Sequence, residues 1–223
     1  MQDHSLCAKS AILCSTNAEV DEINEKIMHQ FDNGQPVVEL RAETKLKTDQ
    51  HNAAQFLQNE DHLENLNQPG TPPHILKLKV GCICFVTRNI SRVDKMVNGS
   101  QVVVTKIIGN YQVETRHLQT GETFIFPRIT FEMKDGGATI LRKQFPLRLC
   151  YAMTKNKSQG QTLDKVTVNE HKFAFSHGQT YVSYGRVCNA ASMLVLVRKD
   201  HPKANGSLHV RNIAWSELLE HAS

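Results

Sequence analysis

Five short β-rich segments lie between residues 74 and 145, and they constrain the fold of this sequence more than any other feature. β-Branched and aromatic residues dominate each segment, and turn pairs such as Asn98-Gly99 and Gly109-Asn110 separate them. Short strands at this spacing predict a small β-barrel of the SH3-like type. The segments are LKLKVGCICFV, SQVVVTKII, YQVETRHL, TFIFPRITF and ATILRKQF.

The sequence before this region has the pattern of a strand followed by a helix. The apolar run AILC predicts the strand, and Thr16 with Glu19 forms a Thr-x-x-Glu capping box that predicts the helix start. Asn33-Gly34 is expected to end the helix. Apolar residues at helical spacing would face the core: Val20, Ile23, Ile27 and Met28.

The strand-and-helix pattern resumes after Phe145. PLRLCYAMT, DKVTV and MLVLV predict three strands, the last of them buried, and the loop TKNKSQGQT follows the first. Ser176 and Gln179 form a second capping box, which predicts a helix through about Val187.

These patterns predict an α/β fold with an inserted β-barrel, because the strand-and-helix signals both precede and follow the barrel. Residues 1–45 would form the first part of the α/β domain, and residues 46–73 a polar connecting excursion. Residues 74–145 would form the barrel, and residues 146–223 the remainder of the α/β domain.

Composition is compatible with a nucleic-acid partner. The chain has 223 residues, 40% of them hydrophobic, which suffices for one core and a smaller second unit. Its net charge of +4 suits a polyanion. Basic residues gather in one stretch. A solvated basic surface without a partner is the alternative to a binding site for a polyanion there. They are Arg142, Lys143, Arg148, Lys155, Lys157 and Lys165.

Several classes of protein find no support in the sequence. No apolar run has the length of a membrane span, and the first residues lack the layout of a secretory signal, so we expect an intracellular protein without membrane contact. The six cysteines form no CxxC pair and no four-ligand zinc set, so no metal site is predicted. Cys82 and Cys84 alternate along a strand and would pack together as small apolar residues.

Two segments have residue types suited to phosphate chemistry. Residues 153–162 (MTKNKSQGQT) combine small hydroxyls, lysine and glycine beside backbone amides, although many surface loops share this composition. Residues 179–187 (QTYVSYGRV) place Arg186 on a predicted helix among aromatic and apolar residues. Its rigid fork of donors suits a phosphate, and a surface ion pair is the alternative.

Together these segments resemble superfamily 1 (1B) DNA helicases of the PIF and Helitron type. QFPLRLCYAMTKNKSQGQTLDKV resembles their motif V with its preceding strand, and SHGQTYVSYGRV resembles their motif VI. AILCSTNAEVDEIN is similar to the segment after their first RecA-like domain. GTPPHILKLKVGCICFVTRNIS, VNGSQVVV, FPRI and LRKQFP resemble their inserted SH3-like module. The resemblance implies the C-terminal portion of such a helicase: a second RecA-like, P-loop NTPase-type domain with a parallel sheet, interrupted by an SH3-like barrel.

The resemblance implies roles for individual residues. Arg186 matches the motif VI arginine that reaches the γ-phosphate as an arginine finger. For Asn17, helix capping is the alternative to a DNA contact. Arg88 and Asn89 could brace the barrel instead of contacting DNA. The positions implied to contact DNA are Asn17, Arg88, Asn89, Thr154, Lys157 and Ser158. The positions implied to face the nucleotide are Gln159, Gly160, Gln179 and Arg186.

The sequence departs from the family pattern at a few positions. Ser183-Tyr184-Gly185 replaces a small-Leu-Ser triplet before Arg186, Lys155 stands where the family prefers an apolar residue, and Ser15 replaces a proline. The sequence also contains neither a GxxxxGK[ST] phosphate loop nor an apolar strand ending in an acidic pair for Mg2+. In the family both belong to the first RecA-like domain.

The resemblance therefore implies an ATP-dependent 5′-to-3′ DNA helicase acting on single-stranded DNA, in genome maintenance or Helitron transposition. ATP and Mg2+ would be held mainly by an upstream RecA-like partner domain, and this chain alone is predicted to be inactive. A eukaryotic source would place it in the nucleus. Two alternatives remain open: a remnant that only binds single-stranded DNA, and a domain that completes a separate ATPase in trans.

Overall fold

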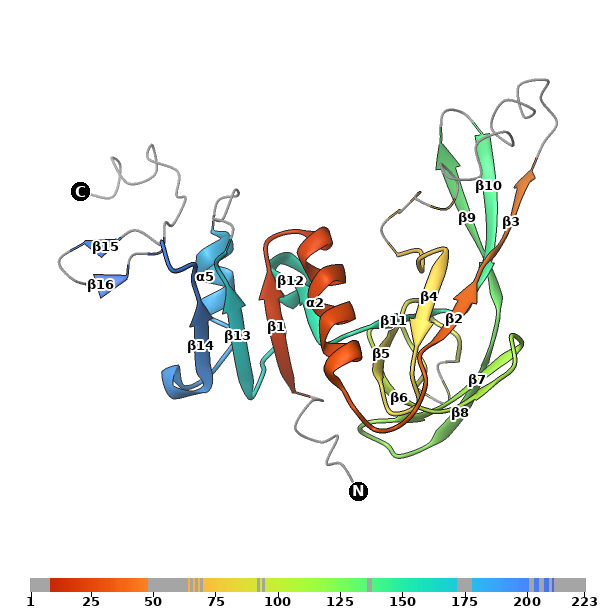
Figure 1. Ribbon diagram of the computed structural model, residues 1–223, viewed down its shortest axis with the longest axis horizontal. Helices are drawn as coiled ribbons and strands as arrows, with labels where there is room; N and C mark the ends of the chain where they lie inside the picture. The colour runs from red at the N-terminus through yellow and green to blue at the C-terminus, as the bar shows by residue number, and fades with distance from the viewer. Residues whose placement is uncertain are drawn as a thin grey trace. The chain divides into compact units, whose positions relative to one another are not determined.

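The computed structural model describes residues 9–47, 64, 66, 68, 70–91, 93, 95–135, 138–171, 178–200, 203–204, 207–208 and 210. Contacts divide the chain into two units (Figure 1). The first consists of Met1–Ile27 and Tyr151–Ser223, and the second is the continuous segment Met28–Cys150. The second unit is thus inserted, in sequence, into the first.

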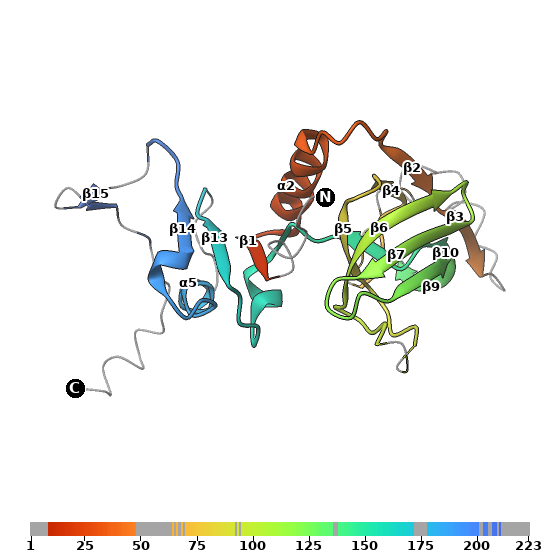
Figure 2. The same cartoon turned by 90° about the horizontal axis from the view of Figure 1, so that it is seen from below.

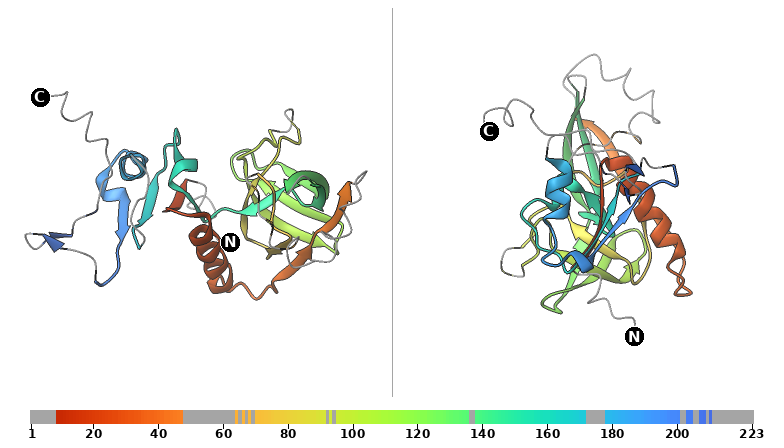
Figure 3. Two further views of the ribbon diagram at one scale, coloured as in Figure 1. Left: turned by 90° about the horizontal axis from the view of Figure 1, so that it is seen from above. Right: turned by 90° about the vertical axis from the view of Figure 1, so that its left-hand side faces the viewer.

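The first unit contains a four-stranded sheet in the order β12-β1-β13-β14. All three pairings are parallel, as the RecA-like α/β class requires. Figures 2 and 3 show the helices α2 and α5 on opposite faces of this sheet. The elements are β1 (Ser10–Cys14), α2 (Asn17–Gln30), β12 (Ala152–Thr154), the 3-10 turn η1 (Lys155–Ser158), β13 (Lys165–Asn169), α5 (Gln179–Tyr184), the 3-10 turn η2 (Ala190–Ser192), β14 (Met193–Leu196), β15 (Lys203–Ala204) and β16 (Ser207–Leu208).

Helix α2 begins at the predicted capping box. The Thr16 backbone N–H donates to Glu19 Oε2 at 3.0 Å, and the Glu19 N–H donates to Thr16 Oγ1 at 3.3 Å. The helix packs its apolar side on Cys14 and Ala152 of the sheet. Buried Asn24 joins helix to strand, because its Oδ1 accepts from the Ala152 N–H at 2.8 Å and its Nδ2 donates to the Ala152 carbonyl at 3.4 Å.

The second unit is built of antiparallel strand pairs. Its sheets have the orders β11-β5-β6-β7-β8, β3-β10-β9 and β2-β4. The SH3-like type of this unit stays a prediction. The strands are β2 (Val38–Arg41), β3 (Glu43–Lys47), β4 (Ile75–Leu78), β5 (Ile83–Val86), β6 (Gln101–Ile108), β7 (Gln112–His117), β8 (Thr123–Pro127), β9 (Ile129–Asp135), β10 (Ala138–Gln144) and β11 (Leu147–Leu149).

Three predicted strands are each divided in two. LKLKVGCICFV breaks at Gly81, whose φ of +90° takes the chain out of the strand conformation between β4 and β5. TFIFPRITF breaks after Pro127, and its halves β8 and β9 enter different sheets. PLRLCYAMT also changes sheet, from antiparallel β11 to parallel β12. Strand β2 falls within residues 1–45, and β3 crosses the expected boundary at residue 45, yet they pair with β4 and β10 of the inserted unit.

The prediction of a buried last strand is wrong. Leu194 and Leu196 are 57% and 39% exposed, because β14 lies at the edge of its sheet with one face incompletely covered. Helix α5 ends at Tyr184 rather than near Val187, with Gly185 as its C-cap. Its N-cap is Gly178, and the predicted capping residue Ser176 lies outside the described residues.

The paired cysteines behave as predicted. Cys82 and Cys84 are both fully buried, with their Sγ atoms 3.9 Å apart. Among the described residues, no three His, Cys, Asp or Glu side chains are grouped in a way that could hold a metal ion. None of the helices in the described ranges is long and apolar enough to cross a membrane.

Candidate nucleic-acid and nucleotide site

The carboxyl edge of the parallel sheet gathers residues from separate parts of the sequence. Because β1, β12, β13 and β14 are all parallel, they end on the same edge, at Cys14, Thr154, Asn169 and Leu196. Open α/β sheets bind their ligands outside this edge. Helix α2 starts there after β1, and the turn η1 starts there after β12.

The loop after β12 is a 3-10 turn capped by Thr154. Thr154 Oγ1 accepts a hydrogen bond from the Lys157 N–H at 3.4 Å, which leaves the hydroxyl hydrogen available as a donor. The Lys157 side chain is exposed, as are Gln159 and Gly160. Gly160 has a φ of +80°, and a side chain there would meet nothing within 4 Å. The glycine is therefore required by the left-handed backbone conformation and not by close packing.

Beneath this loop, two predicted surface residues are buried. Ser158 is fully buried, and its hydroxyl donates to the Lys155 carbonyl at 2.7 Å. Lys155 is also fully buried, and its Nζ donates to Glu170 Oε1 at 2.8 Å. Arg142, in the other unit, is buried on the inward face of β10. The stretch from Arg142 to Lys165 is therefore not one continuous basic surface, because Arg142 and Lys155 are buried.

Arg186 connects the helicase-like motif VI segment to this loop. Its Nε donates to the Val182 carbonyl at 2.8 Å, at the end of α5. Its Nη1 donates to the carbonyls of Gln161 and Ser158 at 3.3 and 3.5 Å. The Leu163 N–H in turn donates to the Arg186 carbonyl at 2.8 Å. The structure thus brings the two predicted phosphate-binding segments together through hydrogen bonds.

Gln179 and Asn17 occupy contrasting positions in this unit. Gln179 is the first residue of α5 and is buried, with its carbonyl accepting from the Ser183 hydroxyl at 2.9 Å. Asn17 is exposed at the first turn of α2. Thr16 and Glu19 cap that helix, so the alternative capping role of Asn17 is taken by its neighbours.

Arg88 and Asn89 lie in the other unit, and both make contacts within it. The Arg88 guanidinium carbon lies 4.8 Å from the centre of the Phe131 ring, a cation–π contact. Asn89 Oδ1 accepts from the Asn98 N–H at 2.8 Å and so ties together the two ends of a loop. Both residues are exposed. These contacts fit the bracing role, while a DNA contact stays a prediction.

Burial shifts two pKa values near the carboxyl edge. Burial, reinforced by the charge of Glu19, raises the pKa of the Cys14 thiol to about 11, so this thiol stays protonated. Burial and the nearby charge of Glu170 raise the pKa of the Tyr184 phenol. Both groups are therefore neutral at physiological pH, which excludes a thiolate nucleophile at Cys14.

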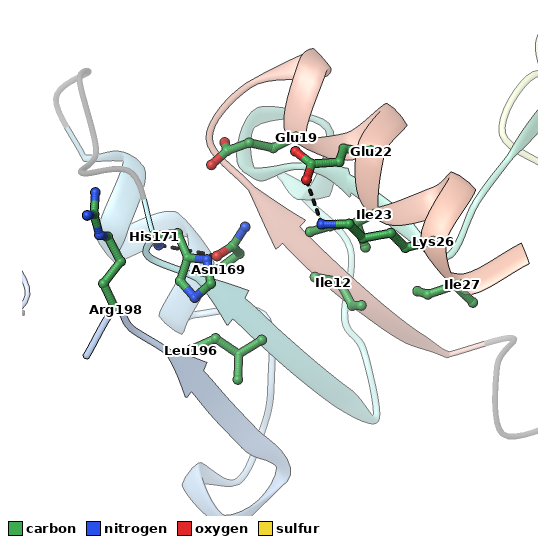
Figure 4. A pocket seen from close by; sticks show the side chains of 10 residues that line it. All are labelled: Ile12, Glu19, Glu22, Ile23, Lys26, Ile27, Asn169, His171, Leu196 and Arg198. Carbon is green, nitrogen blue, oxygen red and sulfur yellow. Dashed lines mark hydrogen bonds and ion pairs between the residues drawn. The ribbon is translucent and has the colours of Figure 1, made fainter. Parts of the chain in front are cut away.

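A groove of about 510 Å³ lies between α2 and the ends of β13 and β14 (Figure 4). Its floor is apolar, and charged side chains surround it, including the exposed Glu22–Lys26 ion pair at 2.6 Å. The sequence did not indicate this groove, because its walls come from elements far apart in the chain. It is lined by Ile12, Glu19, Glu22, Ile23, Lys26, Ile27, Asn169, His171, Leu196 and Arg198.

The chain is similar to known DNA helicases. The model of the Pif1 DNA helicase 2B domain matches residues 61–107. The ATP-dependent DNA helicase Pif1 of Campylobacter jejuni is 27% identical over 221 residues, which is 91% of this chain and 44% of that protein. The ATP-dependent DNA helicase PIF1 of Danio rerio is 33% identical over 124 residues, or 55% of this chain and 19% of that protein. This chain therefore spans less than half the length of these relatives.

A solved structure supports the same fold. The Bacteroides Pif1 helicase in complex with ADP-AlF3 and single-stranded DNA is similar with a TM-score of 0.65 and 21% identity, covering 96% of this chain and 44% of that chain. The parallel sheet and the loop at its carboxyl edge define a RecA-like α/β domain. Within that class, the chain is similar to the C-terminal portion of PIF1-type helicases.

Proposed function

We propose that this chain is the C-terminal part of an ATP-dependent DNA helicase that moves 5′ to 3′ on single-stranded DNA. The observation that carries the proposal is the hydrogen bonding of Arg186 to the loop after β12, at the carboxyl edge of a parallel sheet. A loop that contacts DNA and an arginine that contacts nucleotide would then move together. Such a connection is what a motor needs to link hydrolysis to a shift along the strand.

In this proposal the DNA backbone is held by the exposed side of the loop. Lys157 supplies a positive charge and Thr154 a hydroxyl donor, which are the contacts that position phosphates without reading bases. Ser158 contributes through the turn that its buried hydroxyl stabilises. Asn17 is exposed at the start of α2 on the same edge of the sheet and would add a further polar contact.

The nucleotide is proposed to approach Arg186, Gln159 and Gly160 from the upstream RecA-like domain. Arg186 fits the charge that develops on a transferred phosphoryl group, because its guanidinium is always protonated and offers several donors. Gln179 would support this side from within α5. Mg2+ is proposed to be held mainly by the upstream domain, as the resemblance to the helicase family implies. We place the helicase inside the cell, in the nucleus of a eukaryotic source, in genome maintenance or Helitron transposition.

A titration of single-stranded oligonucleotide with the whole chain tests the DNA contact. Fluorescence anisotropy at several salt concentrations should show weak binding with a negative log–log salt slope. Lys157→Ala should lower the affinity and reduce the slope by about 0.7, the value for one lost phosphate contact on a single strand.

Lys165→Ala is the matched control. Lys165 is also exposed, but it begins β13 and so lies at the opposite end of the sheet from Lys157. Its loss should leave affinity and slope nearly unchanged. Equal effects of the two substitutions, or binding that does not respond to salt, would refute a specific contact at the loop.

A second candidate function is a module that binds single-stranded DNA without supporting turnover. It is favoured by the altered segment before Arg186, where α5 ends at Tyr184 and Gly185 follows, so that Arg186 lies outside the helix. This module would bind DNA like the helicase fragment. It would not restore ATP turnover when joined to a competent upstream domain.

A further inference from the structure

A fully buried ion pair lies beneath the proposed DNA- and nucleotide-binding loop. Lys155 and Glu170 have side chains that are 0% and 1% exposed, with 2.8 Å between Nζ and Oε1. The other carboxylate oxygen of Glu170 is buried and has no hydrogen-bond partner among the described residues. The pair is therefore only partly satisfied, which is an unfavourable arrangement for two charges removed from water.

Stability alone does not explain such a pair. Transfer of each ion from water costs on the order of several kcal/mol, and the attraction between them compensates only when the remaining hydrogen bonds are made. Apolar residues of similar size at the same positions would therefore stabilise the fold equally well or better.

The geometry indicates what the pair holds in place. Glu170 directly follows β13, and Lys155 is the first residue of η1. The Lys155 carbonyl accepts from the Ser158 hydroxyl, and the Ser158 carbonyl accepts from Arg186. A continuous series of polar contacts thus runs from the end of β13 through η1 to the guanidinium of Arg186.

Glu170 also faces the segment that carries Arg186. Its charge contributes to the raised pKa of Tyr184, the last residue of α5. Glu170 is therefore close to both Lys155 and Tyr184.

We propose that Glu170 and Lys155 are positioning residues that pin η1 to the end of β13, so that the loop carbonyls hold Arg186. The proposal rests on the proposed function only in the role given to Arg186. A directional N–H···O bond between charges fixes the turn in one register, whereas two apolar side chains of similar volume would allow it to slide. The pair thus contributes order to the loop and little net stability.

The test uses the whole chain and the double variant Lys155→Met/Glu170→Leu, which removes both charges at similar volume. We expect its melting temperature to equal or exceed that of the unsubstituted chain. Hydrogen exchange, measured without DNA, should be at least tenfold faster than in the unsubstituted chain at the backbone N–H groups of Gln159, Gln161 and Leu163. These groups are hydrogen-bonded in and beside this loop. Exchange in β6 and β7 of the inserted unit should stay unchanged.

The matched control is Lys26→Met/Glu22→Leu, which makes the same changes at an ion pair that is exposed on α2. It should not alter exchange at the three loop amides. Glu170→Gln should melt lower than the Lys155→Met/Glu170→Leu variant, because it leaves a buried ammonium without its counter-charge.

Two results would overturn the inference. Native-like exchange in a well-folded Lys155→Met/Glu170→Leu variant would make the pair dispensable for loop order, and failure of that variant to fold would make it a stabilising element instead. Neither result depends on DNA or nucleotide. A chain that does not bind single-stranded DNA would therefore refute the proposed function while leaving the positioning role to be decided by exchange.

Discussion

The Nη1 atom of Arg186 donates to the carbonyl oxygen of Gln161 across 3.3 Å. The guanidinium therefore rests on neutral acceptors of the adjacent loop. A phosphate oxygen carries negative charge, so its hydrogen bonds to arginine gain an attraction between opposite charges that a neutral carbonyl does not offer. In the proposed function, a nucleotide phosphate would replace these carbonyl contacts of Arg186.

Arg186→Ala should abolish most ATP turnover in the proposed helicase. The chain alone should release no phosphate from Mg-ATP. Joined to its upstream RecA-like domain, the unsubstituted chain should turn over ATP, and Arg186→Ala should reduce this by about 10³-fold or more, as loss of an arginine finger does. Arg186→Lys should restore little of the ATP turnover, because an ammonium lacks the forked donor geometry of a guanidinium. Phosphate release with single-stranded DNA present measures both effects.

Arg198→Ala is the control for this prediction. Arg198 is exposed and pairs with Asp200 at 3.0 Å, so its loss should affect turnover little. If Arg186→Ala melted earlier but hydrolysed ATP normally, the arginine would serve the fold alone. Turnover by the isolated chain above the level of its Arg186→Ala form would also contradict the prediction.

Asn24→Leu should destabilise the first unit by about 2 kcal/mol or more. The substitution removes the acceptor of the Ala152 N–H and the donor to the Ala152 carbonyl, and each buried group left unsatisfied costs about 1–3 kcal/mol. Urea unfolding followed by circular dichroism measures the change. Asn17→Ala, at an exposed position of the same helix, should shift stability by less than about 0.5 kcal/mol. Similar losses in both variants would argue against the buried clamp.

The inserted unit should lose stability as the pH falls below about 6.5, the ordinary histidine pKa. Burial lowers the pKa of His117, with Glu122 opposing and Lys95 adding to the shift. Its Nδ1 accepts from the N–H groups of Gln119 and Thr120 at 3.1 and 3.2 Å, so the folded state favours neutral imidazole.

The sign of this effect follows from the lowered pKa. Above the unfolded pKa the stabilisation is complete, and it is lost as pH falls from that value through the lower folded pKa, because the unfolded chain then binds the proton more readily. Urea unfolding between pH 7.5 and 5 measures it. His117→Asn keeps an acceptor without a titrating ring and should reduce the dependence. The pH dependence that remains should come from His74, because burial also lowers its pKa. If the stability of His117→Asn depended on pH as that of the unsubstituted chain does, His117 would not be the source of the effect.

Local patterns determined much of the fold. The capping box at Thr16 and Glu19 set the start of α2, because the reciprocal hydrogen bonds need only residues three apart. The parallel α/β class and the order of the two motif segments also followed from the sequence. The breaks at Gly81 and Pro127 were not predicted as changes of strand, since a β-rich run has the same composition whether it stays in one sheet or crosses to another.

The sequence by itself determined which residues are candidates for the chemistry, because the segments around Arg186 and from Thr154 to Gly160 resemble helicase motifs. Only the tertiary structure decided which of these side chains face outward. Lys155 and Lys157 are two residues apart and have the same charge, yet one is buried against Glu170 and the other is exposed. A turn at the end of a strand sends neighbouring side chains in different directions. The partner of the buried one, Glu170, directly follows β13 and so lies beyond the loop in sequence. Charge patterns along the chain do not contain that information, because burial depends on what the folded chain places opposite each residue.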